Sequence, residues 1–486
     1  MEYPDLSVSP NIQGIFFRGY TKLDQAAYGF FKVTDRAAFQ RWLDGMLAGG
    51  RITSAAEKQP ADSVQNRMNI AFTAPGLKAL LEDGFLGESY DHSFTGGMVA
   101  PERSRILGDV DANDPRHWLW GGHDEIHGVL MSFAPTKEVA RDELLACLCA
   151  NNGADCMHHS FGGLERTHKE PFGFLDGVSQ PVVAGTPRET FLKRERPKEA
   201  KLMVVPPGEL ILGYPDGTGK LPETPATSAG LDPDGILPPH PTWNERRDFG
   251  KDGSYLVFRT LEQHVDAFWD YVNEVATGEE NDTPIDLAEK MVGRGMDGRA
   301  LAPNPDAENN NNSFDFTDDR DGKFCPIGSH VRRGNNRAVN IRNEKVSLDV
   351  TQRHRILRRA RIYEEEGETG LQFICFQASI VRQFEFMQST WCNNAFFQGL
   401  QKEVDPIIGT PRAPRGGVGP VDRFTIPRTP YRRVLKSVPQ FVTVKGGAYF
   451  FMPSLDALRF VAQSCAAATA LKSVQRAPEE GPADAL

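Results

Sequence analysis

The chain has no excess of basic residues, few cysteines and no long apolar run. Over its 486 residues, 65 acidic side chains outnumber 55 basic ones and give a formal charge of -10 at pH 7. This balance argues against a nucleic-acid-binding protein, whose affinity depends on a basic surface. No apolar segment approaches the length of a membrane-spanning helix, and residues 1–6 lack the basic and apolar regions of a signal peptide. We therefore expect a cytoplasmic protein with no nucleic-acid or membrane partner.

The cysteines are too few and too scattered to indicate a disulfide framework or a zinc site. Their number, 7, is odd, and they lack the paired spacing of zinc ligands. Cys147 and Cys149 stand two positions apart in a predicted helix, so their side chains point in different directions. We expect reduced, mostly buried thiols.

The length of the chain predicts two domains, because 486 residues exceed one ordinary core. Pro, Gly and Asp dominate residues 214–253, which is typical of a boundary between domains. We expect a first domain at residues 1–225 and a second at 226–472. Residues 473–486 are predicted to be a disordered tail because they are polar and rich in Pro and Glu.

Hydrophobic periodicity predicts a mixed α and β protein in which the second half repeats the order of elements of the first. The predicted strands are residues 14–18, 28–33, 68–73, 127–133, 209–213, 254–259, 371–380, 440–444 and 448–452. The predicted helices are residues 36–48, 75–82, 137–150, 261–276, 382–393 and 454–468.

In the segment 170–181, the carboxylate Asp176 stands between two glycines and among apolar residues. Gly173 and Gly177 permit a backbone path that is closed to residues with a Cβ, and prolines at both ends discourage regular structure. We interpret the segment as a rigid loop that directs Asp176 at a ligand. The alternative is a turn in which the Asp side chain bonds only its own backbone.

Two further segments supply a metal ligand and cations. His330 follows a turn that contains Pro and Gly, and Arg332 and Arg333 come directly after it. Imidazole is a common metal ligand, including of haem iron. The run 354–363 carries so many basic residues that it should be buried only where anions are near.

The segments Gly173-Phe-Leu-Asp176-Gly177, with Val-Ser-Gln-Pro after it, and Cys325-Pro-Ile-Gly-Ser-His330 closely resemble the dye-decolourising peroxidases. That family is haem-dependent, and its Gly-x-x-Asp-Gly signature is its most diagnostic feature. The resemblance covers most of the chain and implies an α+β fold of two ferredoxin-like units with antiparallel β-sheets and flanking helices. It also implies that haem is held largely by the second unit.

The resemblance assigns His330 as the axial ligand of the haem iron. An axial histidine usually donates its second ring N–H to an acceptor. Asp405 is the expected acceptor, and Glu385 is the alternative. For Asp405, a role as a capping or turn residue stays open.

On the distal side, Asp176 matches the acid that replaces the usual peroxidase histidine. Arg358 aligns best with the distal arginine, although Arg359 and Arg361 leave its register open. Leu371 and Phe373 match the apolar walls of the distal pocket, and plain core packing is their alternative role.

The resemblance also suggests residues outside the distal pocket. Arg332 and Arg333 are expected to hold the haem propionates, with Arg337 as a further possibility. Tyr363 and Trp391 match positions at which some family members transfer electrons through surface aromatics, and packing is the alternative for both.

These assignments imply a peroxidase that binds one haem b per chain. It would reduce hydrogen peroxide and oxidise organic reductants such as dyes and phenols by one-electron steps, as a monomer or homodimer. The rivals are a haem carrier or storage protein without turnover and a chlorite dismutase-like or haem-precursor enzyme on a related scaffold. A carrier has no use for an acid beside an arginine, and the related enzymes need no distal acid.

Overall fold

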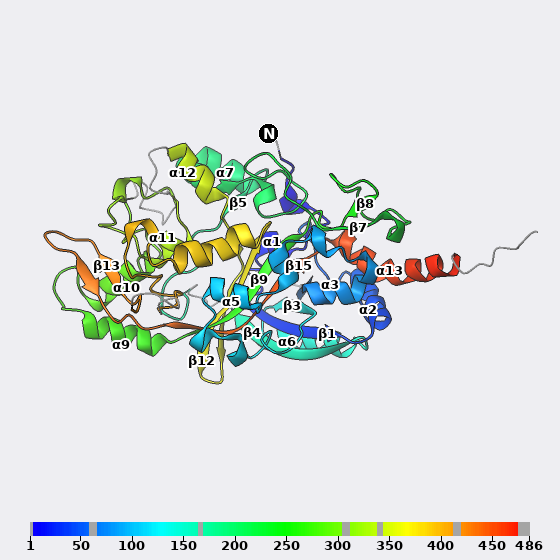
Figure 1. Ribbon diagram of the computed structural model, residues 1–486, viewed down its shortest axis with the longest axis horizontal. Helices are drawn as coiled ribbons and strands as arrows, with labels where there is room; N and C mark the ends of the chain where they lie inside the picture. Colours follow the sequence, from blue (N-terminus) through cyan, green and yellow to red (C-terminus); the bar gives the residue numbers. More distant parts are fainter. Residues whose placement is uncertain are drawn as a thin grey trace, which may run out of the picture.

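The computed structural model describes residues 3–57, 66–163, 169–303, 312–337, 344–411 and 419–474, with backbone only at 344–346 and 465–474 (Figure 1). Of the predicted tail, residues 475–486 lie outside these ranges, whereas residues 473 and 474 still belong to the helix α13 (Leu455–Val474). No helix in the described ranges combines the length and apolar character needed to cross a membrane.

The first half of the chain forms a four-stranded antiparallel sheet with the order β4-β1-β3-β2. The strands are β1 (Gln25–Val33), β2 (Arg67–Phe72), β3 (Gly128–Ala134) and β4 (Ala154–Gly163). Two helices, α2 (Arg36–Ala48) and α6 (Lys137–Cys149), follow β1 and β3. Asp35 and Thr136 cap them, each accepting the backbone N–H three residues ahead.

The second half repeats this arrangement in the order β15-β9-β12-β11. Its strands are β9 (Ser254–Gln263), β11 (Arg361–Glu365), β12 (Glu368–Gln377) and β15 (Val442–Met452), and the helix α9 (Val265–Val275) follows β9. In each half the fourth strand lies next to the first, and the third lies between the first and the second. The expected α+β fold of two ferredoxin-like units is therefore confirmed.

The two sheets join at both edges and close into one barrel. β4 pairs with β11 at Gly163 and Ile362, and β2 pairs with β15 at Phe72 and Phe451. Because β12 also pairs with β9, eight strands form a ring in the described part of the chain. A short additional strand, β10 (Leu357–Arg358), also pairs with β12, on the same edge as β11 but further along the strand.

The barrel interior is a packed aromatic core. Side chains at alternate positions of the strands point inward, as the two-residue period of a β-strand requires. Phe30 stacks on Trp120 with 3.9 Å between ring centroids, and the indole N–H of Trp120 donates to the Thr260 hydroxyl over 3.0 Å. A residue of the first half thus bridges to a strand of the second.

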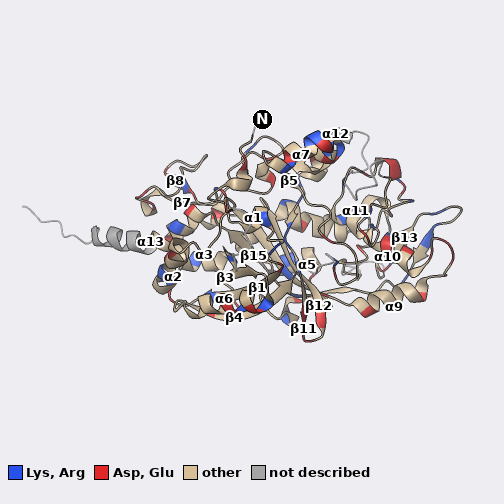
Figure 2. Cartoon of the chain, turned by 180° about the vertical axis from the view of Figure 1, so that it is seen from behind, with Lys and Arg blue, Asp and Glu red and all other residues tan. Residues whose placement is uncertain are grey.

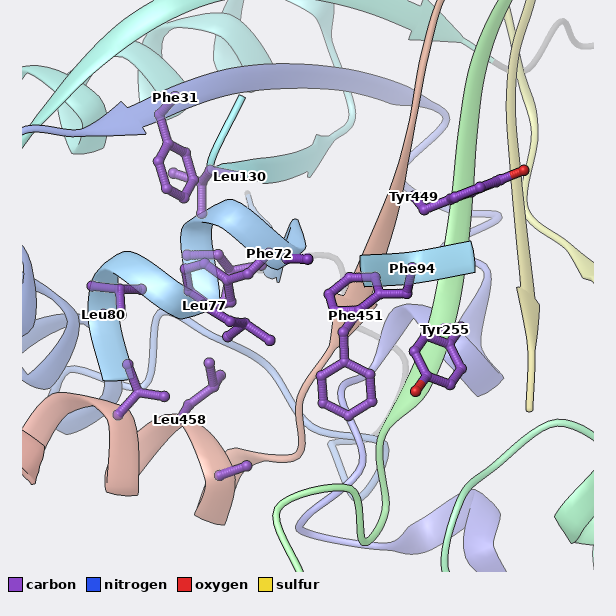
Figure 3. Close-up of a cluster of buried hydrophobic side chains, with 14 of the residues drawn as sticks. Phe31, Phe72, Leu77, Leu80, Phe94, Leu130, Tyr255, Tyr449, Phe451 and Leu458 are labelled. Atoms are coloured by element: carbon purple, nitrogen blue, oxygen red, sulfur yellow. The ribbon is translucent and has the colours of Figure 1, made fainter. Parts of the chain in front are cut away.

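Helices cover the outer face of the first sheet. Phe31, Phe72 and Leu130 pack against Leu77 and Leu80 of α3 (Ala74–Leu81), beside Leu458 of α13 (Figure 3). The outer face of the second sheet is covered differently, by loops and short helices at the opposite end of the molecule (Figure 1). That second face carries the candidate site.

Short elements make up the remainder. The helices are α1 (Ile15–Arg18), α4 (His92–Gly96), α5 (Pro101–Leu107), α7 (Pro187–Glu195), α8 (Pro197–Met203), α10 (Pro284–Val292), α11 (His330–Gly334) and α12 (Glu344–Gln352). Paired short strands are β5 (Val182–Val183) with β6 (Val204–Val205), β7 (Ala226–Ser228) with β8 (Arg246–Asp248), and β13 (Phe424–Ile426) with β14 (Arg433–Leu435). Outer helices such as α7 and α10 carry both acidic and basic residues (Figure 2).

Several predicted elements differ from the structure. Residues 15–18 form the helix α1 instead of a strand. Residues 209–213 are not a strand either. They begin at the end of a 3-10 turn (Pro207–Glu209), where the buried Glu209 carboxylate binds Arg382. The sequence prediction missed β4, whose exposed His and Cys positions hide its period. The predicted strands 440–444 and 448–452 are one strand, β15, and residues 382–393 form two π-helical turns, η10 (Val381–Glu385) and η11 (Met387–Cys392).

Candidate active site

A large cavity lies on the outer face of the second sheet and encloses about 1930 Å³ of empty space, including its open mouth. Its floor is made of side chains at alternate positions of the strands, which are Leu261 of β9, Leu371 and Phe373 of β12, and Val442 and Val444 of β15. The opposite wall comes from residues 172–181, from α11 and from η11. Its size and its apolar walls with a few polar groups suit a bulky, flat, mostly apolar cofactor.

Asp176 lies at this cavity on a loop that its own backbone and one buried acid hold in place. Gly173 and Gly177 have φ values of 97° and 73°, the left-handed region that glycine tolerates best. The Glu170 carboxylate accepts the backbone N–H groups of residues 172 and 174 over 3.0 and 2.9 Å, and the Gln263 side-chain amide over 2.7 Å. Burial raises the pKa of Glu170.

The Asp176 side chain faces an arginine instead of bonding its own backbone. Its Oδ1 lies 3.7 Å from Nη2 of Arg358, and both side chains are partly exposed to the cavity. The segment after Asp176 holds this arginine, because Arg358 donates its backbone N–H to Gln180 and a guanidinium N–H to the Ser179 carbonyl. The rigid loop that we predicted thus brings acid and arginine together.

The strand register separates Arg358 from its neighbours. Arg358 pairs with Cys375 in the sheet, so it shares a face with Phe373 and Leu371, which also line the cavity. Arg359 points the other way and donates to the carbonyls of α1, and Arg361 donates to carbonyls of residues 19, 20 and 23.

His330 begins α11 and lines the same cavity. Its Nδ1 lies 2.9 Å from Oδ2 of Asp405, which is 1% exposed and accepts the backbone N–H groups of residues 407 and 408 through Oδ1. Burial alone would lower the pKa of His330, but the Asp405 carboxylate raises it overall. For Asp405, burial would raise the pKa, and the His330 charge and hydrogen bond lower it overall. Because a carboxylate only accepts, the proton is on Nδ1 and Nε2 keeps a free lone pair.

The alternative acceptor, Glu385, lies in a separate network. It accepts the Tyr449 hydroxyl over 2.8 Å, and the Ser93 hydroxyl and the Arg103 guanidinium over 2.9 Å. Glu385 is therefore occupied away from His330.

The placement of three arginines corrects the expectation for the haem propionates. Arg332 donates to the carbonyls of residues 319 and 325, and Arg333 to those of residues 328, 391, 394 and 403. Arg337 donates to carbonyls of residues 312 and 314. None of the three lines the cavity. Because Arg332 and Arg333 donate to these backbone carbonyls, they stabilise the chain around α11.

The two aromatics expected at the surface are buried. Tyr363 is 5% exposed and does not line the cavity, and Trp391 is 6% exposed and forms part of the cavity wall. By contrast, Tyr431 is 83% exposed. Their burial favours the packing alternative, and an electron-transfer role for Tyr363 and Trp391 stays a prediction.

Of the arginines that line the cavity, sequence reasoning missed Arg259, Arg294 and Arg355. Arg355 belongs to the basic run that we noted, whereas Arg294 carries no local signal in the sequence. Within the described ranges, no three or more His, Cys, Asp or Glu side chains gather into a metal site. Two imidazoles line the cavity, and His354 is engaged by the Arg382 carbonyl and the Phe386 ring, which leaves His330 as the candidate donor. One imidazole in a mostly apolar cavity fits a metal that brings its own macrocycle.

Comparison with known proteins agrees with this chemistry. Residues 11–154 match the family model of the DyP dimeric α+β barrel domain, and residues 210–399 match that of the C-terminal part of Dyp-type peroxidases. A dye-decolorizing peroxidase of Mycetinis scorodonius is 28% identical over 93% of this chain and 87% of its own length.

Two solved structures are similar along nearly the whole chain. A dye-decolorizing peroxidase in complex with 2,6-dimethoxyphenol is 27% identical, with a TM-score of 0.71 and coverage of 93% of this chain and 99% of that one. The DyP-type peroxidase of Anabaena sp., at 24% identity, shares the fold, with a TM-score of 0.73 and coverage of 93% and 94%. The fold and site are those of a haem-dependent peroxidase. Within that class, the chain belongs to the dye-decolourising peroxidase family.

Proposed function

We propose that the chain binds one haem b, with His330 as its axial ligand, and couples hydrogen peroxide reduction to one-electron oxidation of dyes and phenols. The observation that carries this proposal is that Asp176 and Arg358 form a pair at the cavity that His330 also lines. The likeness to a structure with a bound dimethoxyphenol supports phenols as donors.

On the ligand side, the chain fixes one imidazole. Asp405 holds the proton on Nδ1, so Nε2 stays available as a donor and the ring keeps its orientation. Two backbone amides and its burial keep Asp405 itself in place. When bound, ferric haem supplies the redox chemistry.

On the reacting side, Asp176 is the acid and base. It takes the proton from one peroxide oxygen and returns it to the other, which then leaves as water. Arg358 carries a fixed positive charge beside it, and that charge stabilises the negative charge that develops on the departing oxygen. Leu371 and Phe373 line the same cavity and form apolar walls there.

The proposal leaves a carrier role and a chlorite dismutase-like role without support, since neither uses an acid paired with an arginine. Residence in the cytoplasm, assembly as a monomer or homodimer, and the domain division at residue 225 stay predictions.

Turnover separates the proposal from haem binding alone. Haem-loaded protein is mixed with hydrogen peroxide and an anthraquinone dye or 2,6-dimethoxyphenol across acidic pH. We expect bleaching or phenol oxidation that requires both protein and peroxide. Stable haem binding without turnover would instead identify a carrier.

A further inference from the structure

Three buried arginines form what we call the arginine edge: Arg294 and Arg355 line the cavity, and Arg337 lies behind Arg294 without lining it. Arg294 and Arg337 both donate to Oδ1 of Asn312, over 2.8 and 2.7 Å. Their guanidinium carbons lie 5.3 and 4.0 Å from the ring centroid of Phe314. The charges of Arg294 and Arg355 both contribute to a pKa of Arg337 well below its usual value, after burial as the main cause. Arg294 and Arg337 therefore lie close together, and Arg355 lies near enough to Arg337 to affect its pKa.

The arginine edge concentrates buried positive charge. Arg294, Arg337 and Arg355 are 5%, 0% and 6% exposed. Burial lowers the pKa of Arg294 and of Arg355 to about 10, and for Arg355 it is the sole cause. The carboxylates of Glu199 and Asp315 offset part of the shift at Arg337, whereas no ion pair among the described residues includes Arg355. Burying a charge without a partner is costly. The edge therefore needs an anionic partner.

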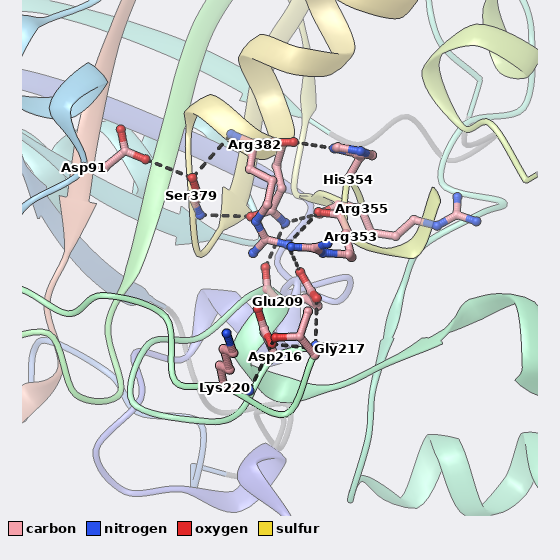
Figure 4. Close-up of polar contacts among 12 residues, drawn as sticks. Asp91, Glu209, Asp216, Gly217, Lys220, Arg353, His354, Arg355, Ser379 and Arg382 are labelled. Atoms are coloured by element: carbon pink, nitrogen blue, oxygen red, sulfur yellow. Dashed lines mark hydrogen bonds and ion pairs between the residues drawn. The ribbon is translucent and has the colours of Figure 1, made fainter. Parts of the chain in front are cut away.

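Arg355 is the member with free donors. Its backbone is fixed, because the Gln383 amide donates to its carbonyl while Arg382 holds the carbonyl of Arg353 (Figure 4). Its Nε and Nη2 are buried and have no hydrogen-bond partner in the described part of the chain, yet the residue lines the cavity. Arg332 and Arg333 are equally buried but donate to backbone carbonyls.

We propose that Arg355 binds a carboxylate of the haem propionates, while Arg294 and Arg337, whose guanidinium groups already donate to the carbonyl of residue 298 and to Asn312, add positive charge. A guanidinium offers paired N–H donors that match a carboxylate, and such charge-assisted bonds are the strong ones. Two propionates would supply the negative charge that the edge lacks. This inference rests on the proposed function, and it replaces Arg332 and Arg333 as the propionate partners.

The test uses two forms of the cofactor. Apoprotein is titrated with haemin and with haemin dimethyl ester, whose propionates are esterified and uncharged, and binding is followed by the absorption of the haem. We expect Arg355→Met to weaken haemin binding at least 10-fold and to change ester binding by less than 3-fold. Arg353→Met, two residues away and outside the cavity lining, is the matched control and should change neither.

A second readout guards against misfolding. Because Arg355→Met removes an unpaired buried charge, the variant apoprotein should melt at or above the wild-type temperature, while haemin should raise its melting temperature less than it raises that of wild type. An equal loss of affinity for haemin and ester, or no loss for either, would overturn the role of Arg355. Failure of wild-type protein to bind haemin at all would instead overturn the proposed function.

Discussion

At the scale of single residues, the site depends on which hydrogen-bond partners each charged side chain finds. Five arginines near the motifs share a similar sequence context, yet Arg332, Arg333, Arg359 and Arg361 are satisfied by backbone carbonyls. Arg358 instead faces Asp176. The motif around Asp176 and the identity of Arg358 could be predicted from sequence. The carbonyl partners could not, because they come from turns that are distant along the chain.

The acid role of Asp176 predicts a selective loss in Asp176→Asn. An amide cannot take a proton from peroxide, so the rate at which haem-loaded enzyme reacts with peroxide should fall about 100- to 10,000-fold, with haem retention unchanged. Stopped-flow absorbance measures the rate, and Asp234→Asn, at an exposed loop position, is the control. An undiminished rate in Asp176→Asn would remove the acid and base assignment.

At the scale of elements, the period of apolar residues, which differs between helices and strands, was the most informative sequence signal. It placed α2 at its observed bounds and β1, β2, β3, β9 and β12 close to theirs. It failed where polar side chains occupy a strand, as in β4, and where buried polar groups determine the backbone, as at Glu209. Alternation along β10 also separates Arg358 from Arg359, because the sheet pairing fixes which side each one faces.

The loop that presents Asp176 depends on Glu170, and the raised pKa of Glu170 predicts a pH effect. A carboxyl whose pKa is raised by folding holds its proton more tightly in the folded state than in the unfolded one. Its contribution to stability therefore falls as pH rises from about 4.3, the ordinary value for Glu, through the raised value. In Glu170→Gln this part of the decline should disappear.

The free energy of unfolding in urea between pH 4 and 7 measures this effect. We expect a steeper decline with pH in wild type than in Glu170→Gln, even though the variant is less stable overall because its amide keeps only one of the two oxygens that accept the backbone N–H groups. Glu274→Gln, at an exposed helix position, is the control. If the free energy of unfolding declined with pH at the same slope in wild type and in Glu170→Gln, the raised pKa of Glu170 would be contradicted.

At the scale of the whole molecule, barrel closure couples the two halves. The pairs β4–β11 and β2–β15 and the Trp120–Thr260 hydrogen bond all join residues from different halves. Hydrogen exchange should therefore give the same opening free energy for the amides of β1 and β3 as for those of β9 and β12. A lower value in one set, measured by mass spectrometry at several denaturant concentrations, would show that the halves open independently.

The central claim is that one imidazole at this cavity holds the haem while an acid and an arginine act on peroxide. The most direct measurement is the absorption spectrum of His330→Ala after incubation with haemin, with and without added imidazole. We predict weak or no haem retention in the variant and partial recovery of the wild-type spectrum with free imidazole. A spectrum and haem content equal to wild type without imidazole would contradict the account.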